Sequence, residues 1–261
     1  MLKEIISREN QIIKLIKALK DRNGRKKYGL FFIEGLKIVE EAAFFVPERI
    51  HYIILNKSFA ELYKERLKEY SKNFECIILP DSLFKEISDT QTPQGILAVL
   101  KIKQLFINDF SFKNEHIIIL DSVRDPGNIG TIIRTAEAMG FDSIFLTKGC
   151  TDIYSPKVTR STMGSIFRTR IYENCLKEDI CLLKKQGYSI ISAALKNNSI
   201  FLNDINTHKK SAIVIGNEAD GISDDLISIS DIIVKVPMKG KTESLNAAVA
   251  AAIIMYHFAF N

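Results

Sequence analysis

Three short stretches of polar residues and glycines follow apolar runs in this sequence, at positions where side chains could bind a ligand. They span residues 125–130, 216–221 and 237–246. Each run before them is rich in β-branched residues, as a strand is, and a helical pattern follows each turn. Helix N-termini favour anions, and glycines let the backbone approach a ligand closely. We therefore expect the three turns to meet in one site.

The first turn has neither the GxGxxG spacing of a dinucleotide site nor the GK[ST] ending of a P-loop, so nucleotide hydrolysis is not expected. Asn128 stands at the start of the predicted helix 129–139, and Arg134 follows six residues later. Six residues turn a helix by about 600°, about 120° off the same face. Asn128 and Arg134 can therefore reach one site only if Asn128 is a cap. The alternative is an ordinary N-cap and a surface arginine.

The other two turns also offer polar groups beside glycines. Gly216 and Gly221 flank an acidic loop in which Glu218 could orient a hydroxyl or an amine. The alternative is a simple turn that leads into a capped helix. Ser244 and Asn246 end the third turn, where they either cap the C-terminal helix or point at a ligand.

Composition narrows the class of protein. The chain has 261 residues, of which 46% are hydrophobic and 26% charged, as in ordinary globular proteins. It shows no apolar run of the ~18 residues that span a membrane and no apolar core of a signal peptide, so we expect a cytoplasmic protein without membrane association. The four cysteines form no CxxC pair and have no His cluster beside them. Reduced thiols are expected, and a metal site is not.

Strand and helix patterns alternate along the chain, which predicts an α/β protein of two domains. In residues 1–103 we expect a small α/β domain with strands 30–33, 52–55, 76–79 and 96–100 and helices 8–21, 35–45, 59–70 and 82–87. Residues 102–115 lose the periodicity, and residues 104–115 are the expected linker. In residues 116–261 we expect strands 116–121, 143–146, 189–194, 212–216 and 232–236, with helices at 129–139, from about 155, and at 245–258. This pattern favours an open parallel sheet that binds ligands at the carboxyl ends of its strands.

The three turns resemble the motifs of the SpoU (TrmH-type) family of RNA ribose 2′-O-methyltransferases, within the SPOUT superfamily. The first motif, Asn-x-Gly-x-x-x-Arg followed by Thr-Ala, matches residues 128–136. The second, Gly-x-Glu-x-x-Gly, matches residues 216–221, and the third, Pro-Met-x-Gly-x-x-x-Ser-Leu-Asn, matches residues 237–246. The resemblance covers nearly the whole chain, with three motifs in order.

Further stretches extend the resemblance. Residues 32–35 (Phe-Ile-Glu-Gly) and 92–95 (Thr-Pro-Gln-Gly) are similar to the family's N-terminal substrate-binding domain, and residues 160–164 to its RNA-facing segment. The resemblance implies an N-terminal α/β RNA-binding domain and a C-terminal α/β SPOUT methyltransferase domain with a trefoil knot. It also implies a homodimer with its sites near the interface.

The resemblance assigns roles to particular residues. It implies S-adenosylmethionine as the cofactor, held by the positions of Gly216, Val236 and Leu245, and it implies catalytic roles for Asn128, Arg134, Glu218, Ser244 and Asn246. A free guanidinium stays protonated, so we expect Arg134 to bind the RNA phosphate and ribose and to offset the developing alkoxide charge.

Charge indicates a polyanionic partner. Seven basic residues and one acid fall between Lys14 and Lys27, a density that suits a nucleic acid, RNA or DNA, although a solvated helix face is the alternative. We expect RNA contacts from Lys14, Arg25, Lys26, Lys27, Arg160 and Arg168. The implied reaction is methyl transfer to a ribose 2′-hydroxyl, in ribosomal RNA because a dedicated RNA domain precedes the second one. A transfer RNA methyltransferase and a non-catalytic RNA- or ribosome-binding assembly factor are the alternatives.

Overall fold

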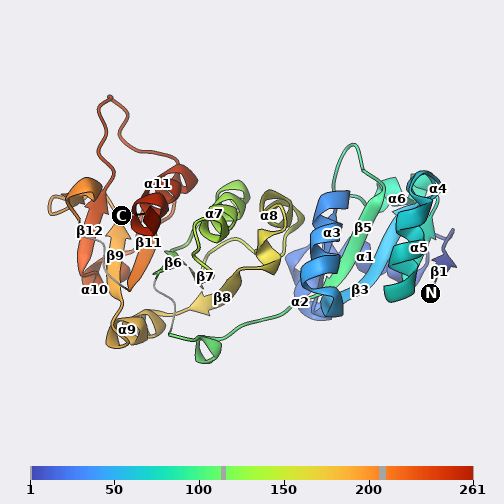
Figure 1. Cartoon of the computed structure of the whole chain (residues 1–261), viewed down its shortest axis with the longest axis horizontal. Helices are drawn as coiled ribbons and strands as arrows, with labels where there is room; N and C mark the ends of the chain where they lie inside the picture. The colour runs from blue at the N-terminus through green and yellow to red at the C-terminus, as the bar shows by residue number, and fades with distance from the viewer. Residues whose placement is uncertain (1, 113–115, 206–209, 261) are drawn as a thin grey trace. The chain divides into compact units, whose positions relative to one another are not determined.

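The computed structural model describes three stretches of the chain, residues 2–112, 116–205 and 210–260. The chain divides into two compact units, each described here by itself (Figure 1). Unit 1 holds Met1–Lys103 and Asp152–Phe167, and unit 2 holds Gln104–Thr151 and Arg168–Asn261. A segment from the middle of the sequence is thus part of the N-terminal unit. Residues 113–115 of the predicted linker lie outside the described residues.

Unit 1 is built on a five-stranded mixed sheet in the order β1-β4-β3-β5-β2. β5 is antiparallel to β2 and β3, and the other pairs are parallel. The strands are β1 (Leu2–Glu4), β2 (Leu30–Glu34), β3 (Ile50–Asn56), β4 (Cys76–Leu79) and β5 (Ile96–Lys101). The helices are α1 (Gln11–Leu19), α2 (Arg22–Tyr28), α3 (Leu36–Phe45), α4 (Lys57–Leu62), α5 (Lys64–Asn73), α6 (Asp81–Ile87) and α8 (Pro156–Ser161).

Two predicted helices of unit 1 are each divided in the structure. The helix expected over 8–21 ends at Leu19, and a second helix starts at Arg22. Gly24 lies inside that second helix, where a Cβ would stand 1.9 Å from the carbonyl oxygen of Ala18. Glycine therefore lets the backbones of α1 and α2 touch. The helix expected over 59–70 breaks at Tyr63, which lies between α4 and α5 with non-helical backbone angles.

Unit 2 contains a seven-stranded sheet in the order β10-β12-β9-β11-β6-β7-β8, with every pair parallel. Its strands are β6 (His116–Leu120), β7 (Ser143–Thr147), β8 (Arg170–Cys175), β9 (Ser189–Ala193), β10 (Ile200–Phe201), β11 (Ser211–Ile215) and β12 (Ile232–Lys235). Its helices are α7 (Pro126–Ala138), α9 (Lys177–Lys185), α10 (Asp224–Ile229) and α11 (Ala247–Phe260). The expected parallel α/β sheet is confirmed.

The strand order brings distant turns together. The chain leaves β6 toward β7 and β8 at one edge, whereas β11, β9 and β12 lie in succession on the other side of β6. In a parallel sheet the carboxyl ends of neighbouring strands share one edge, and a ligand binds where the order reverses. The turns after β6, β11, β9 and β12 are therefore neighbours.

The C-terminal helix α11 is apolar around its whole circumference. One face packs against α7, with Ala251, Ile254 and Met255 buried. Within the described parts of the chain, no helix combines the length and the apolar character needed to span a membrane.

Candidate active site

A cavity of ≈ 630 Å³ lies at the carboxyl edge of the unit 2 sheet. Its walls come from the ends of β9, β11 and β12 and from the start of α11. Gly216, Val236 and Leu245, the three positions expected to hold the cofactor, all line it. So do Glu218, Ser244 and Asn246. In Figure 1 the segment between β12 and α11 extends away from the body of unit 2 before it returns to the helix.

The loop after β11 is fixed by its own backbone. Asn217 N–H donates to the carbonyl of Gly221 at 2.9 Å, and Gly221 N–H donates to the carbonyl of Asn217 at 3.0 Å. This closure brings residue 221 so near that a Cβ on Gly216 would lie 2.3 Å from the carbonyl carbon of Gly221. Only glycine fits at position 216, because the backbone of the same loop occupies the space that a Cβ would need.

Asn217 organises the same loop with its side chain, and sequence reasoning gave it no role. Its Nδ2 donates to the carbonyl of Ser122 at 2.8 Å, which ties the turn after β11 to the turn after β6. Its Oδ1 accepts from the N–H groups of Ala219 and Asp220. An Asn beside the motif glycine, at a strand end, was the available signal, because Asn favours such turns.

Three of the expected catalytic residues form one hydrogen-bonded chain. Asn246 Nδ2 donates to Asn128 Oδ1 at 2.9 Å, and Asn128 Nδ2 donates to Glu218 Oε1 at 2.8 Å. Asn128 is buried, with 8% of its surface exposed, and thus joins two residues that line the cavity. The three turns singled out in the sequence therefore meet, as expected.

The Glu218 carboxylate is held in its ionised form. Burial raises the pKa of Glu218, but hydrogen bonds from the Asn128 side chain and from the backbone N–H groups of Glu218, Arg124 and Asp125 outweigh it and lower the pKa below the ordinary value. The contacts from the N–H groups of Arg124 and Asp125 are long, at 3.4 Å each. At neutral pH this carboxylate is an acceptor that faces the cavity.

The structure does not bring Arg134 to this cavity. Asp125 is the N-cap of α7, since its Oδ1 accepts from Asn128 N–H at 2.8 Å, and Asn128 is a helical residue. The alternative in which Asn128 caps the helix is therefore wrong, and Arg134 lies about 120° around α7 from it. Arg134 is exposed, and its guanidinium has no hydrogen bond or ion pair to any residue that the structure describes. Pro126 at the first helical position was the signal for a cap at 125.

Ser244 and Asn246 differ in their local roles. α11 begins at Ala247, and Asn246 Oδ1 accepts from the N–H groups of Ala248 and Val249 at 2.9 and 3.3 Å. Asn246 is therefore both the cap of α11 and a donor to Asn128. Ser244 is exposed, lies outside the helix and lines the cavity.

Sequence reasoning also missed one wall of the cavity. Residues 193–196, at the carboxyl end of β9 and just beyond it, line it together with the motif residues. These residues are Ala-Ala-Leu-Lys and offer no polar motif to single out. Only their position at the end of a strand in a parallel sheet could have indicated them.

The candidate RNA contacts fall into different environments. Lys26 and Lys27 are exposed on α2, and Lys14 is exposed but pairs with Glu9 at 2.6 Å. Arg25 is only 4% exposed. Its Nε and Nη2 bond to Asp152 Oδ2 at 2.8 and 2.7 Å, and its Nη1 donates to two backbone carbonyls of α1 and its C-cap. Arg25 thus stabilises unit 1, and its guanidinium is not available to a phosphate.

The two remaining arginines are partly exposed and paired. Arg160, on α8 of unit 1, lies 3.1 Å from Asp89 Oδ2. Arg168, in unit 2, donates from Nε to Glu137 Oε1 at 2.8 Å. Each keeps surface that a phosphate could reach, at 41% and 25% side-chain exposure respectively.

All four cysteines are free, and burial raises the pKa of Cys76 and of Cys150 to about 11 and that of Cys175 to about 12. Among residues 2–112, 116–205 and 210–260, no three His, Cys, Asp or Glu side chains gather as metal ligands would.

Known proteins match both parts of the chain. Residues 115–256 match the model of the SpoU rRNA Methylase family, and residues 10–98 match the MRM3-like substrate binding domain. The 23S rRNA (guanosine(2553)-2'-O)-methyltransferase RlmP of Bacillus subtilis is 34% identical over 256 residues, which cover 98% of this chain and 99% of that protein.

Two further comparisons extend along the whole chain. The 23S rRNA (uridine(2479)-2'-O)-methyltransferase of Streptomyces viridochromogenes is 25% identical over 261 residues, covering 97% of this chain and 91% of that protein. The structure of an AdoMet-bound rRNA methyltransferase from Sinorhizobium meliloti superposes with a TM-score of 0.86 at 28% identity, covering 98% of this chain and 97% of that one.

Proposed function

Because the chain belongs to the SpoU rRNA methylase family, we propose that it transfers a methyl group from S-adenosylmethionine to a ribose 2′-hydroxyl of ribosomal RNA. Two relatives that match nearly the whole chain are named as 23S rRNA 2′-O-methyltransferases, one for a guanosine and one for a uridine. Ribosomal RNA is therefore the proposed substrate, whereas the base of the modified nucleotide differs among relatives.

The observation that carries this proposal is the chain of hydrogen bonds from Asn246 through Asn128 to Glu218. It joins the three family motifs at the wall of a single cavity. A polar network of this kind holds its side chains in one arrangement, because each amide group has a fixed partner. Catalysis of group transfer between two bound molecules depends on such fixed positioning.

The cavity suits the proposed cofactor. Its volume of ≈ 630 Å³ lies within the range of ligand pockets in proteins, about 300–1,000 Å³. Gly216, Val236 and Leu245 would hold the cofactor with backbone groups and apolar surface at the strand ends. When bound, S-adenosylmethionine supplies an activated methyl group on its sulfonium.

The side chains would then act on the RNA. The Glu218 carboxylate and the Ser244 hydroxyl face the cavity and would orient the ribose by hydrogen bonds. Arg134 would bind the phosphate and offset the negative charge that develops on the 2′-oxygen.

Arg134 would act in a homodimer. It lies on α7, which packs against α11, and it lies away from the cavity of its own chain. α11 carries an exposed apolar stripe at helical spacing, formed by Val249, Ile253, Tyr256 and Phe260. If two copies pair through this stripe, the arginine of one chain can serve the cavity of the other. Light scattering of Tyr256→Glu beside the unaltered protein tests this, since an unchanged dimer mass would contradict it.

The trefoil knot and the cytoplasmic location are proposed as family traits. The loops after β11 and β12 line the same cavity, which supports the knot because a knot would hold these two loops against each other. Refolding measured after full denaturation would test it, because threading a chain end is slow. A cytoplasmic location is supported by the proposed substrate, and fractionation of cells would test it.

Labelled S-adenosylmethionine and RNA from cells with and without this gene test the proposed reaction. The protein should label ribosomal RNA from cells that lack the gene, and not ribosomal RNA that is already modified. The labelled site should resist alkaline hydrolysis, as a 2′-O-methyl ribose does. Labelling of transfer RNA instead would support the transfer RNA alternative. Cofactor binding without labelling of any RNA would support the assembly factor.

A further inference from the structure

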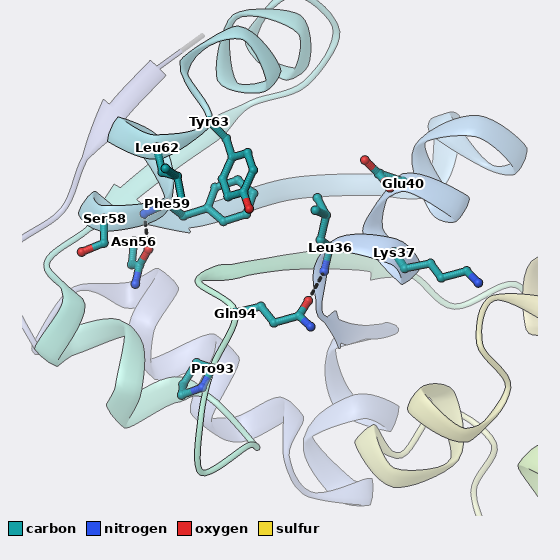
Figure 2. A pocket seen from close by; sticks show the side chains of 10 residues that line it. All are labelled: Leu36, Lys37, Glu40, Asn56, Ser58, Phe59, Leu62, Tyr63, Pro93 and Gln94. Atoms are coloured by element: carbon teal, nitrogen blue, oxygen red, sulfur yellow. Dashed lines mark hydrogen bonds between the residues drawn. The ribbon is translucent and has the colours of Figure 1, made fainter.

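A second pocket lies on the surface of unit 1, far along the sequence from the methyl-transfer motifs. Its volume is ≈ 830 Å³, and Figure 2 shows its lining: Leu36, Lys37, Glu40, Asn56, Ser58, Phe59, Leu62, Tyr63, Pro93 and Gln94. All of these residues fall within 10–98, the stretch that matches the MRM3-like substrate binding domain. The proposed function gives this pocket no role.

Two side-chain amides in the pocket have fixed orientations. Gln94 Oε1 accepts from Leu36 N–H at 2.8 Å, and Asn56 Oδ1 accepts from Phe59 N–H at 2.8 Å. A backbone N–H requires an acceptor, so these bonds identify which end of each amide is oxygen. The two NH₂ groups are left as donors, and neither has a partner within the described residues. The pocket therefore presents hydrogen-bond donors to whatever enters it.

Two glycines make room for these amides. Gly95 has φ +83°, and a Cβ there would lie 2.4 Å from Asn56 Oδ1. Gly35 has φ +116°, and a Cβ there would lie 3.3 Å from Gln94 Oε1. The left-handed backbone and the close approach both favour glycine. The Glu-Gly and Pro-Gln-Gly stretches noted in the sequence thus build one feature, a pair of amides aimed outward.

The other side of the pocket is aromatic. Tyr63 lies at the break between α4 and α5, and its ring stands 4.5 Å from the ring of Phe59 with a tilt of 36°. Figure 2 shows both rings on the side opposite the Gln94 amide. Phe59 is buried, whereas Tyr63 and its neighbour Leu62 are exposed, at 37% and 74%. An exposed ring backed by a buried ring is a surface on which a flat group can stack.

Charge around the rim favours an anion. Glu40 forms an ion pair with Arg66, which neutralises the one carboxylate among the lining residues. Lys37 is exposed and forms no ion pair with any residue of the described stretches. The rim thus combines one free cation with an aromatic surface and two amide donors. Unpaired nucleotides in RNA are bound by these elements: stacking, contacts to base edges and a cation for the phosphate.

We propose that this pocket binds one unpaired nucleotide of the RNA substrate, with its base stacked on Tyr63 and acceptors of the base facing Asn56 and Gln94. This inference rests on the proposed function for its ligand class, RNA. Two donors favour an edge with adjacent acceptors, such as O6 and N7 of guanine. Adenine instead puts an amino group beside N7, so guanine should be preferred.

The test measures the fluorescence anisotropy of two labelled RNA hexamers as the full chain is added. One hexamer has six adenines, and the other has five adenines and one central guanine. The unaltered protein should bind the guanine hexamer about tenfold more tightly. Asn56→Asp and Gln94→Glu keep the oxygen that accepts the backbone N–H and replace only the NH₂ donor. Each should abolish the preference while leaving the unfolding midpoint in urea unchanged. Gln91→Glu adds the same charge three residues away, outside the pocket lining, and should keep the preference.

Tyr63→Leu should weaken the binding of both hexamers about tenfold, because stacking on an aromatic ring depends little on which base is stacked. Equal binding of the two hexamers by the unaltered protein, or a preference retained in Asn56→Asp and Gln94→Glu, would overturn the proposal. Methyl transfer to ribosomal RNA is measured in parallel. If the protein methylates RNA but shows no guanine preference, the nucleotide-binding role of the pocket is contradicted and the proposed reaction stands. If the preference is found without methyl transfer to any RNA, the proposed reaction is contradicted and the nucleotide-binding role of the pocket stands.

Discussion

The side chain of Asn246 donates a hydrogen bond to Asn128 across 118 residues of sequence, at 2.9 Å. Asn128 in turn donates to Glu218 at 2.8 Å, so both ends of its amide are occupied. The amide cannot rotate without losing both bonds, and this fixes the identity of its oxygen and nitrogen. One buried asparagine therefore sets the relative positions of three turns.

Asn128→Asp should destabilise unit 2, because it replaces the donor that faces Glu218 with a second carboxylate oxygen. We expect the free energy of unfolding to fall by about 1–2 kcal/mol. This is the lower part of the range for hydrogen bonds to charged groups, because Glu218 is exposed and solvent screens its charge. Glu218→Gln added to Asn128→Asp should recover part of the loss by restoring a donor–acceptor pair. Urea unfolding of the four proteins measures the coupling. Simple additivity of the two changes would contradict the pairing.

Acid should weaken the same network in a defined pH range. The pKa of Glu218 is lowered on folding, so its contribution to stability is present above the unfolded pKa of about 4.3 and is lost as the pH falls through the folded value. The difference in melting temperature between the unaltered protein and Glu218→Gln should therefore be constant from pH 7 to about 5 and shrink below pH 4. A difference that stays constant down to pH 3 would contradict the lowered pKa.

Arg134→Ala should separate catalysis from cofactor binding. The residue does not line the cavity of its own chain, so affinity for S-adenosylmethionine should stay within about twofold. Methyl transfer should fall by about 10²–10³-fold, the usual effect of removing a group that stabilises developing charge. Equilibrium dialysis and single-turnover assays measure the two quantities. Lys185→Ala, an exposed cation on α9, is the matched control, and a normal rate in Arg134→Ala would exclude the proposed role.

Arg25 and Lys26 are neighbours in sequence with opposite expected behaviour. Arg25→Ala removes a buried guanidinium and leaves Asp152, at 14% side-chain exposure, without its partner. Losses of about 3–5 kcal/mol are typical for such a broken pair, so unit 1 should unfold at lower urea concentration. Lys26→Ala should stay within about 0.5 kcal/mol. Similar unfolding midpoints for the two variants would refute the structural role of Arg25.

Lys26 and Lys27 should instead affect RNA binding through salt. If both contact phosphates, the double variant Lys26→Ala, Lys27→Ala should reduce the slope of log affinity against log salt by about 1.4–1.8. Lys68→Ala, an exposed cation on α5, should leave that slope unchanged. Binding of a ribosomal RNA fragment at four salt concentrations measures both. An unaltered slope in the double variant would assign these lysines to a solvated surface.

Much of the fold and the convergence of the three turns could be predicted from the sequence. Uninterrupted apolar runs indicate parallel strands, and strand ends in such a sheet share one edge. The divided helices could not be predicted in this way. Tyr63 is no helix breaker by residue type, yet its backbone angles are non-helical between α4 and α5. Strand β8 escaped notice because its Arg-Ile-Tyr-Glu-Asn-Cys sequence shows only a partial alternation.

The sequence also could not predict which charged side chains are buried and paired. Arg25 stands in a basic run beside Lys26 and Lys27, and nothing local distinguishes it from them. Its burial depends on Asp152, a residue that lies 127 positions away. Arg134 illustrates the same limit, because the helical periodicity places it on a face of α7 but does not indicate what that face contacts.

The composition of unit 1 has a consequence for how this protein is made. The chain passes between the two units three times, and Asp152–Phe167 completes a unit that begins at the N-terminus. During translation, residues 1–103 emerge with the partner of Arg25 still unsynthesised, so the first unit cannot reach its final state until residue 167 has left the ribosome. A fragment cut after residue 103 would carry the same unfinished interior permanently.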